Sequence, residues 1–174
     1  SDHGMTEIRR LLDIQGIVRS SNYELGRDYV AFYDSTMARF WFRNATVGKR
    51  MMEILGRISL GKVLTIRDYD NYKLRSIDKD KFGDLIFLAN QGVYIYPNYF
   101  HCSIPSYFKG MHGYDPNHHT ENGIVLYLGT RPFKRRANLS VVDLLPIILE
   151  IIGLGVSTRN CVKFHLLKTC SKYI

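Results

Sequence analysis

Short apolar and aromatic runs separated by turn residues predict two strand pairs. Residues 29–33 and 37–42 are rich in aromatic side chains, and Asp-Ser-Thr at 34–36 divides them. Residues 85–89 and 93–96 flank Asn-Gln-Gly at 90–92 in the same way. Aromatic and β-branched residues favour strands, and short polar or glycine-containing breaks favour tight turns. We therefore expect two hairpins.

Apolar residues at helical spacing predict three helices. The clearest covers 47–58, with Asn44 or Thr46 as its N-cap. Another is expected to begin at Thr6 and to place Ile8, Leu11 and Leu12 on one face. The last, at 142–154, has Asp143 at its N-cap, Pro146 in its first turn and Gly153 at its C-terminal end. Its many isoleucines and leucines predict deep burial.

The remaining pattern indicates an α/β class. Residues 124–128 form a continuous apolar run closed by Gly129, which is typical of a central strand buried on both faces. Residues 60–84 are polar and are expected to form short strands or turns at the surface. Their acidic clusters at 68–70 and 78–81 could bind metal, but solvated loops are the favoured interpretation. Strands that alternate with helices favour α/β or α+β.

Composition narrows the class of protein and of partner. The chain has 174 residues, of which 45% are hydrophobic, so it is globular rather than disordered. No apolar run reaches the roughly 18 residues of a membrane span. The net charge of +8 favours phosphate-bearing partners, and the basic residues are densest at 131–136. The sequence does not identify a cellular compartment.

The candidate chemistry lies in two short motifs. Asp2 and His3 precede Gly4, and roughly a hundred residues later His112 precedes Gly113. Carboxylate and imidazole are suitable zinc ligands, and a glycine beside them allows a sharp turn at the exit of a strand. Each motif alone is weak evidence for a metal site. The other four histidines have no expected role.

Together, the order of these blocks resembles the nucleotide pyrophosphatase/phosphodiesterase branch of the alkaline phosphatase superfamily. In that family a Ser-Asp-His-Gly-Met block, a variable segment, a His-Gly-Tyr-Asp block and a closing strand and helix follow one another. This chain offers the first block at 1–5 and the His-Gly-Tyr-Asp block at 110–116. The closing strand and helix correspond to 123–129 and 142–154. The resemblance implies an α/β/α sandwich with a central, mostly parallel sheet, helices on both faces and an inserted hairpin-rich segment.

The resemblance also implies a reaction and a site. Family members hydrolyse phosphodiester or pyrophosphate bonds with two divalent ions, most often zinc, with manganese as an alternative. Carried onto this sequence, Asp2 and His3 would bind the ion that holds the nucleophile, and His112 would bind the second ion. A nucleotide or similar phosphoester would be the substrate, and nucleic acid is not expected as a specific partner.

The departures from the family pattern lead to a further expectation. The family's nucleophile and its remaining metal ligands lie before the Ser-Asp-His-Gly block, so no catalytic nucleophile is assigned in this chain. We expect a C-terminal fragment of a catalytic domain that is inactive without its N-terminal half. Its parts would be a motif loop and helix at 1–15, the variable segment at 16–100, the second motif with closing strand and helix at 101–156, and a divergent tail at 157–174.

Two alternatives stay open. The chain could be a non-catalytic basic protein that binds nucleic acid or other anions, for which a steep salt dependence of binding would be the sign. It could also derive from a related phosphatase or phosphonate hydrolase of the same superfamily.

Overall fold

The computed structural model describes residues 1–72, 74, 82–101, 103, 109–129 and 138–154. They divide into two compact units, one that contains Ser1 and the described part of 3–124 and another that contains Asp2 and the described residues from Val125 onward. The acidic cluster at 78–81, the basic stretch at 131–136 and the tail at 157–174 lie outside the described residues. No helix in the described ranges is long and apolar enough to cross a bilayer.

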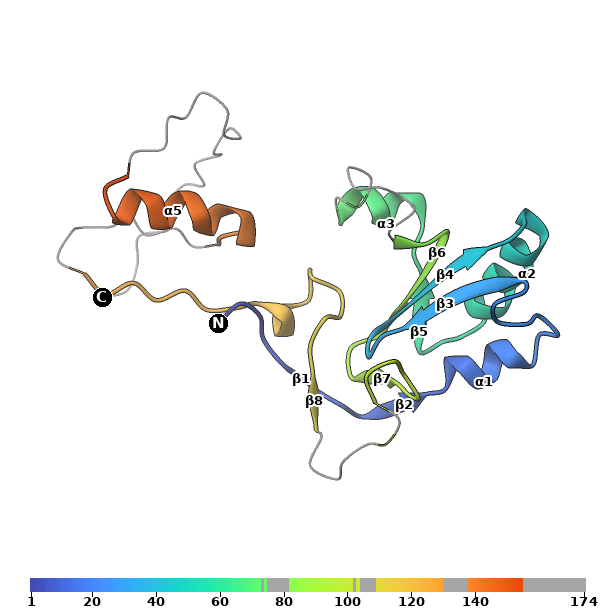
Figure 1. Ribbon diagram of the computed structural model, residues 1–174. Coiled ribbons are helices and arrows are strands. Elements are labelled where there is room, and N and C mark those ends of the chain that lie inside the picture. The colour runs from blue at the N-terminus through green and yellow to red at the C-terminus, as the bar shows by residue number, and fades with distance from the viewer. Residues whose placement is uncertain (73, 75–81, 102, 104–108, 130–137, 155–174) are drawn as a thin grey trace. The chain divides into compact units, whose positions relative to one another are not determined.

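A four-stranded antiparallel sheet forms the centre of the first unit (Figure 1). The strand order is β3-β4-β6-β5. The bounds are Tyr29–Tyr33 for β3, Met37–Phe42 for β4, Gly61–Val63 for β5 and Leu85–Ala89 for β6. The predicted hairpin of β3 and β4 is confirmed, with Tyr29 opposite Phe42 and Tyr33 opposite Ala38.

Helix α2, Ala45–Gly56, confirms the clearest helix prediction. It begins at Asn44, whose side-chain oxygen accepts hydrogen bonds from the backbone N–H groups of Thr46 and Val47, both at 3.1 Å. These bonds satisfy donors that the first turn of a helix otherwise leaves unpaired. Of the two expected N-caps, Asn44 is therefore the one used.

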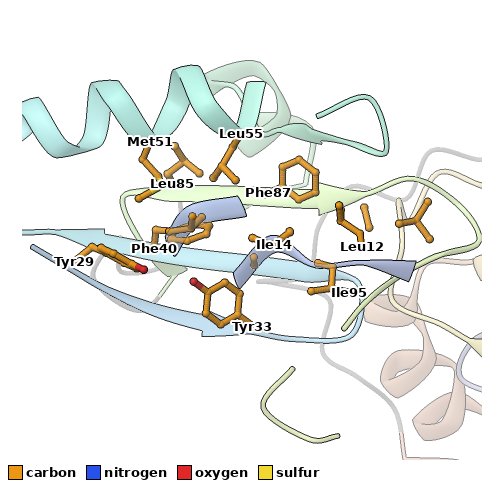
Figure 2. Close-up of a cluster of buried hydrophobic side chains, with 14 of the residues drawn as sticks. Leu12, Ile14, Tyr29, Tyr33, Phe40, Met51, Leu55, Leu85, Phe87 and Ile95 are labelled. Atoms are coloured by element: carbon orange, nitrogen blue, oxygen red, sulfur yellow. The ribbon is translucent and has the colours of Figure 1, made fainter. Parts of the chain in front are cut away.

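The main hydrophobic core lies between α2 and the sheet. Figure 2 shows Met51 and Leu55 of α2 pointing toward the strands, where Phe40 and Phe87 lie, and all four side chains are fully buried. The opposite face of β6 is covered as well, because Ile86 and its neighbours pack with side chains of the segment that contains α3, Ile66–Asn71.

Strand β6 does not form the expected hairpin with the run that follows it. Strand β7, Val93–Ile95, pairs instead in parallel with β2, Arg10–Leu12. All five residues of β6 are buried, since β4 and β5 flank it and apolar clusters cover both its faces. A strand in that position has both edges occupied, so the hairpin prediction was wrong.

The predicted helix from Thr6 was also wrong. The chain there forms β1, Thr6–Glu7, which pairs with β8, Gly110–Met111, and then β2. Pairing with strands 80 or more positions away overrides a helical spacing of only three apolar residues. The first helix, α1, covers Ile14–Arg19 and begins at Asp13, whose carboxylate accepts a 2.7 Å bond from Gly16 N–H.

The polar stretch after residue 60 contains strand β5, as expected, and helix α3, which was not expected. Thr65 and Asp68 form a capping box at the start of α3. Lys62 donates a 2.8 Å hydrogen bond to Asp68 Oδ1. Asp68 is thus a structural residue rather than a solvated one.

Asp68 leads to a prediction about acid stability. Its hydrogen bonds from Lys62 and then from Thr65 lower its pKa to about 2, below the roughly 3.9 of an unfolded chain. A depressed carboxylate pKa stabilises the fold above about pH 4, and this stabilisation is lost as the pH falls toward 2. The Asp68 side chain is still 18% exposed, so water partly screens its interactions, and we expect Asp68→Asn to be about 1 kcal/mol less stable at pH 7.

Chemical denaturation across pH checks this expectation. The difference in unfolding free energy between Asp68→Asn and the unaltered chain should shrink between about pH 4 and pH 2, because a protonated carboxyl no longer stabilises the fold through its charge. A difference that is constant over this range would contradict it.

The second unit departs from the sequence prediction. Residues 124–128 form no strand in the described chain, and Leu126 and Leu128 are 78% and 86% exposed. Backbone hydrogen bonds join only Ile124 of this run to another described segment, at Ser1, so the run lacks the strand neighbours on both sides that a buried strand requires. Helix α5, Leu144–Ile151, begins near the expected place and ends before Gly153, whose φ is +79°. Only Ile147 of its side chains is buried, so the expected deep burial was wrong for the described unit.

The fold is therefore mixed α/β. Its four-stranded sheet is antiparallel, and the described residues contain one parallel pair, β2 with β7. The central, mostly parallel sheet of the expected sandwich is not among the described strands.

Candidate metal centre

The structure brings together the two histidines predicted as metal ligands. The rings of His3 and His112 stack with their centroids 3.7 Å apart and their planes 15° from parallel. His3 lies three residues before β1, and His112 directly follows β8. Because β1 and β8 pair with Thr6 opposite Met111, two motifs distant in sequence meet at one end of this ribbon.

A hydrogen bond fixes the tautomer of His3. Its Nδ1 lies 2.8 Å from the backbone carbonyl oxygen of Gly4. A carbonyl can only accept, so Nδ1 carries the proton, and in the neutral ring the lone pair is on Nε2. This is the common arrangement for a histidine that binds metal through Nε2. His3 is half-buried and His112 is exposed.

The glycines beside the two histidines act differently. Gly113 has φ = +88°, a conformation that other residues rarely adopt, as expected for a sharp turn. Position 4 instead requires glycine because there is no room for a side chain: a Cβ atom there would overlap the backbone carbonyl oxygen of Thr120. The segment at 120–122 thus lies directly against the first motif.

Residues after the second motif form a polar network that sequence reasoning missed. Thr120 Oγ1 lies 2.7 Å from Thr6 Oγ1 and accepts a 2.8 Å hydrogen bond from Gln91 Nε2. His118 Nδ1 is 2.9 Å from the same Thr120 hydroxyl. Thr6 was expected to cap a helix, and nothing in the sequence pattern singles out Thr120. The network joins the strand after His3 to the segment after His112.

The second motif is anchored to the rest of the first unit. Tyr114 packs in the main core, and burial raises the pKa of its phenol to about 12. Asp115 accepts a 2.7 Å hydrogen bond from Tyr72 Oη. Burial tends to raise the pKa of Asp115, but hydrogen bonds from Asn117 and Tyr72 outweigh it and hold that pKa below its usual range.

The donor set gives a partial fit to divalent metal. Two imidazoles are suitable ligands, but a tetrahedral zinc site needs three or four donors. In the described part of the chain, no three His, Cys, Asp or Glu side chains gather in a way that could hold an ion. Asp2 is exposed and adjoins His3 in the chain. Its role as a ligand, like those of His3 and His112, stays a prediction.

The stacking also limits how the rings could bind. The lone pair of an imidazole nitrogen lies in the plane of its ring, and these two planes are nearly parallel. One ion about 2 Å from both nitrogens would lie well outside at least one ring plane. In this arrangement the rings can serve two separate ions, or one ion only after a ring rotates.

Comparison with known proteins gives structural neighbours only. No family model matches the chain, and no curated protein matches it. Among solved structures it is similar to human ectonucleotide pyrophosphatase/phosphodiesterase 5, with 22% identity and a TM-score of 0.49. Two structures of the murine protein, one of them described as inactive and in complex with AMP, each give 21% identity and a TM-score of 0.49. Each alignment covers 70% of this chain and 30% of the neighbour.

Proposed function

We propose that this chain contributes His3 and His112 to a two-metal centre that hydrolyses phosphodiester or pyrophosphate bonds, as in the nucleotide pyrophosphatase/phosphodiesterase family. The observation that carries the proposal is the 3.7 Å approach of the two rings from distant motifs. Independently of this contact, the order of the sequence blocks predicts both residues as ligands through its resemblance to that family. Their parallel planes suit the assignment of each ring to a different ion.

The chemistry is divided between the metal pair and the protein. Two divalent ions, most often zinc, would neutralise charge on the phosphoryl group during an in-line displacement. The residues of this chain would hold the ions in place: His3 through Nε2, with Nδ1–H bonded to Gly4, and His112 at the end of β8. Asp2 is proposed as the second ligand beside His3. The net charge of +8 favours a nucleotide or similar phosphoester substrate.

The same proposal extends to the domain as a whole. The exposed apolar side chains at 124–128 need covering neighbours, and two imidazoles need further donors. Both needs would be met if the chain is the C-terminal part of an alkaline phosphatase-like domain, with further strands and ligands supplied by residues outside those described.

Metal affinity tests the site. We expect the 174-residue chain to bind zinc weakly, because two imidazoles are an incomplete donor set, and isothermal titration calorimetry measures the affinity. His3→Ala and His112→Ala should each weaken binding at least about tenfold, because each removes a donor. His119→Ala is the matched control, since His119 is also exposed and lies after the second motif; its affinity should be unchanged. Equal affinity in all four proteins would overturn the proposal.

A substrate assay on the same samples tests the catalytic part. With zinc and a chromogenic phosphodiester, the chain alone should show no turnover, because no nucleophile is assigned within it. Turnover that His112→Ala abolishes would show instead that the chain has a complete centre.

A further inference from the structure

Glu121 lies between the two histidine motifs and uses both oxygens of its carboxylate. It is the last residue of the short 3₁₀ turn η2, His119–Glu121, and is half-buried. Oε2 accepts hydrogen bonds from the backbone N–H groups of Gly113 at 2.7 Å and Tyr114 at 3.2 Å. These two residues directly follow His112. One side of the carboxylate therefore holds the second motif.

The other side of Glu121 holds the first motif. Oε1 accepts hydrogen bonds from Thr6 Oγ1 at 3.4 Å and from Gln91 Nε2 at 3.3 Å. The backbone carbonyl of Glu121 accepts a further bond, at 3.3 Å, from the N–H of Gly4, the neighbour of His3. A single residue thus bonds to the chain within one position of each histidine.

The contact between the rings needs such a support. Stacking of two aromatic rings contributes only about 1 kcal/mol, and one of these rings is exposed to competing water. The β1–β8 ribbon has only two residues in each strand, so strand pairing alone holds His3 and His112 together only weakly. Hydrogen bonds from backbone N–H groups to a carboxylate are stronger than those between neutral groups.

We propose that Glu121 is a positioning residue that sets the spacing of His3 and His112. The carboxylate suits this role because donors approach both of its oxygens. A glutamine side chain offers one acceptor oxygen and would turn an NH₂ group toward donors on the other side. The spacing of the rings is a property of the metal-free chain. Only the expected effect of Glu121 on metal binding rests on the proposed function.

Glu121→Gln tests the role in the full chain without metal. In the unaltered protein, nuclear Overhauser contacts are expected between ring protons of His3 and His112. Glu121→Gln should lose them while the chain stays folded. Asp84→Asn is the matched control, because Asp84 also accepts a backbone hydrogen bond, from Phe42 N–H at 2.8 Å, in the turn before β6. It should keep the ring contacts.

Zinc affinity is the second readout on the same proteins. Glu121→Gln should weaken binding about tenfold, as is usual when a group that orients ligands is lost, and Asp84→Asn should not. A folded Glu121→Gln chain with unchanged ring contacts and affinity would overturn the inference. If the unaltered chain binds no zinc, the proposed function fails, and the ring contacts alone then decide the role of Glu121.

A milder variant covers the case in which Glu121→Gln does not fold. Thr6→Val keeps nearly the same shape and removes only the hydroxyl that bonds to Thr120 and to Glu121 Oε1. It should weaken the ring contacts, because the first motif loses its side-chain link to Glu121. Ring contacts as strong as in the unaltered chain would overturn the inference.

Discussion

Phe40→Ala is expected to lower the free energy of unfolding of the first unit by about 4 kcal/mol. Phe40 lies in the middle of β4 and is fully buried. Its ring contacts those of Tyr29, Tyr33 and Phe42, with centroids 5.8 to 6.3 Å apart. Truncation to alanine removes these contacts and leaves a cavity that a sheet held by β3 and β6 cannot close.

The same hairpin supplies the control for this prediction. Val30 lies on β3 and is 54% exposed, on the face opposite to Tyr29. Val30→Ala should cost less than about 1 kcal/mol, because the side chain buries little apolar surface. Urea denaturation followed by circular dichroism measures both variants. A loss for Phe40→Ala no larger than that for Val30→Ala would mean that Phe40 is not central to the core.

Local patterns predicted the elements whose partners are close in sequence. The β3–β4 hairpin follows from two aromatic runs and a short polar break, and α2 follows from apolar spacing with Asn44 before it. Both depend on interactions within a few residues. Strands β1 and β2 depend on β8 and β7, which lie more than 80 positions away, and no local feature reveals that pairing.

The candidate site was predictable only through resemblance. His3 and His112 are isolated histidines in sequence, and only the order of the surrounding blocks suggested that they act together. Glu121 and Thr120 could not be predicted, because their link to the first motif depends on contacts with residues more than a hundred positions away. A Thr-Glu pair in a polar loop has no distinctive pattern of its own.

Gly4 is needed for a different reason from the one that the sequence suggested. The sequence suggested that this glycine allows a sharp turn, but its φ is not in the left-handed region, whereas that of Gly113 is. Glycine is required at position 4 because no side chain fits there. A Cβ atom would overlap the carbonyl oxygen of Thr120 and come within 3.1 Å of the carbonyl oxygen of Asn122. Backbone atoms cannot rotate out of the way as a side chain can.

Gly4→Ala is therefore expected to cost at least about 2 kcal/mol of stability and to separate His3 from His112. The methyl group would push the first motif away from the segment at 120–122, and the hydrogen bond from Gly4 N–H to Glu121 would lengthen or break. Thermal denaturation measures the first effect. The loss of nuclear Overhauser contacts between the two imidazole rings measures the second.

Gly56→Ala distinguishes this effect from that of adding any methyl group. Gly56 is the last residue of α2, and a Cβ atom there would meet nothing within 4 Å. Alanine favours the helix, so this variant should be neutral or more stable by up to about 1 kcal/mol, with the ring contacts unchanged. If Gly4→Ala behaves in the same way, the close approach of the two backbone segments does not exist in solution. The structural basis for the His3–His112 pair would then be wrong, because that approach is what holds the first motif beside the second.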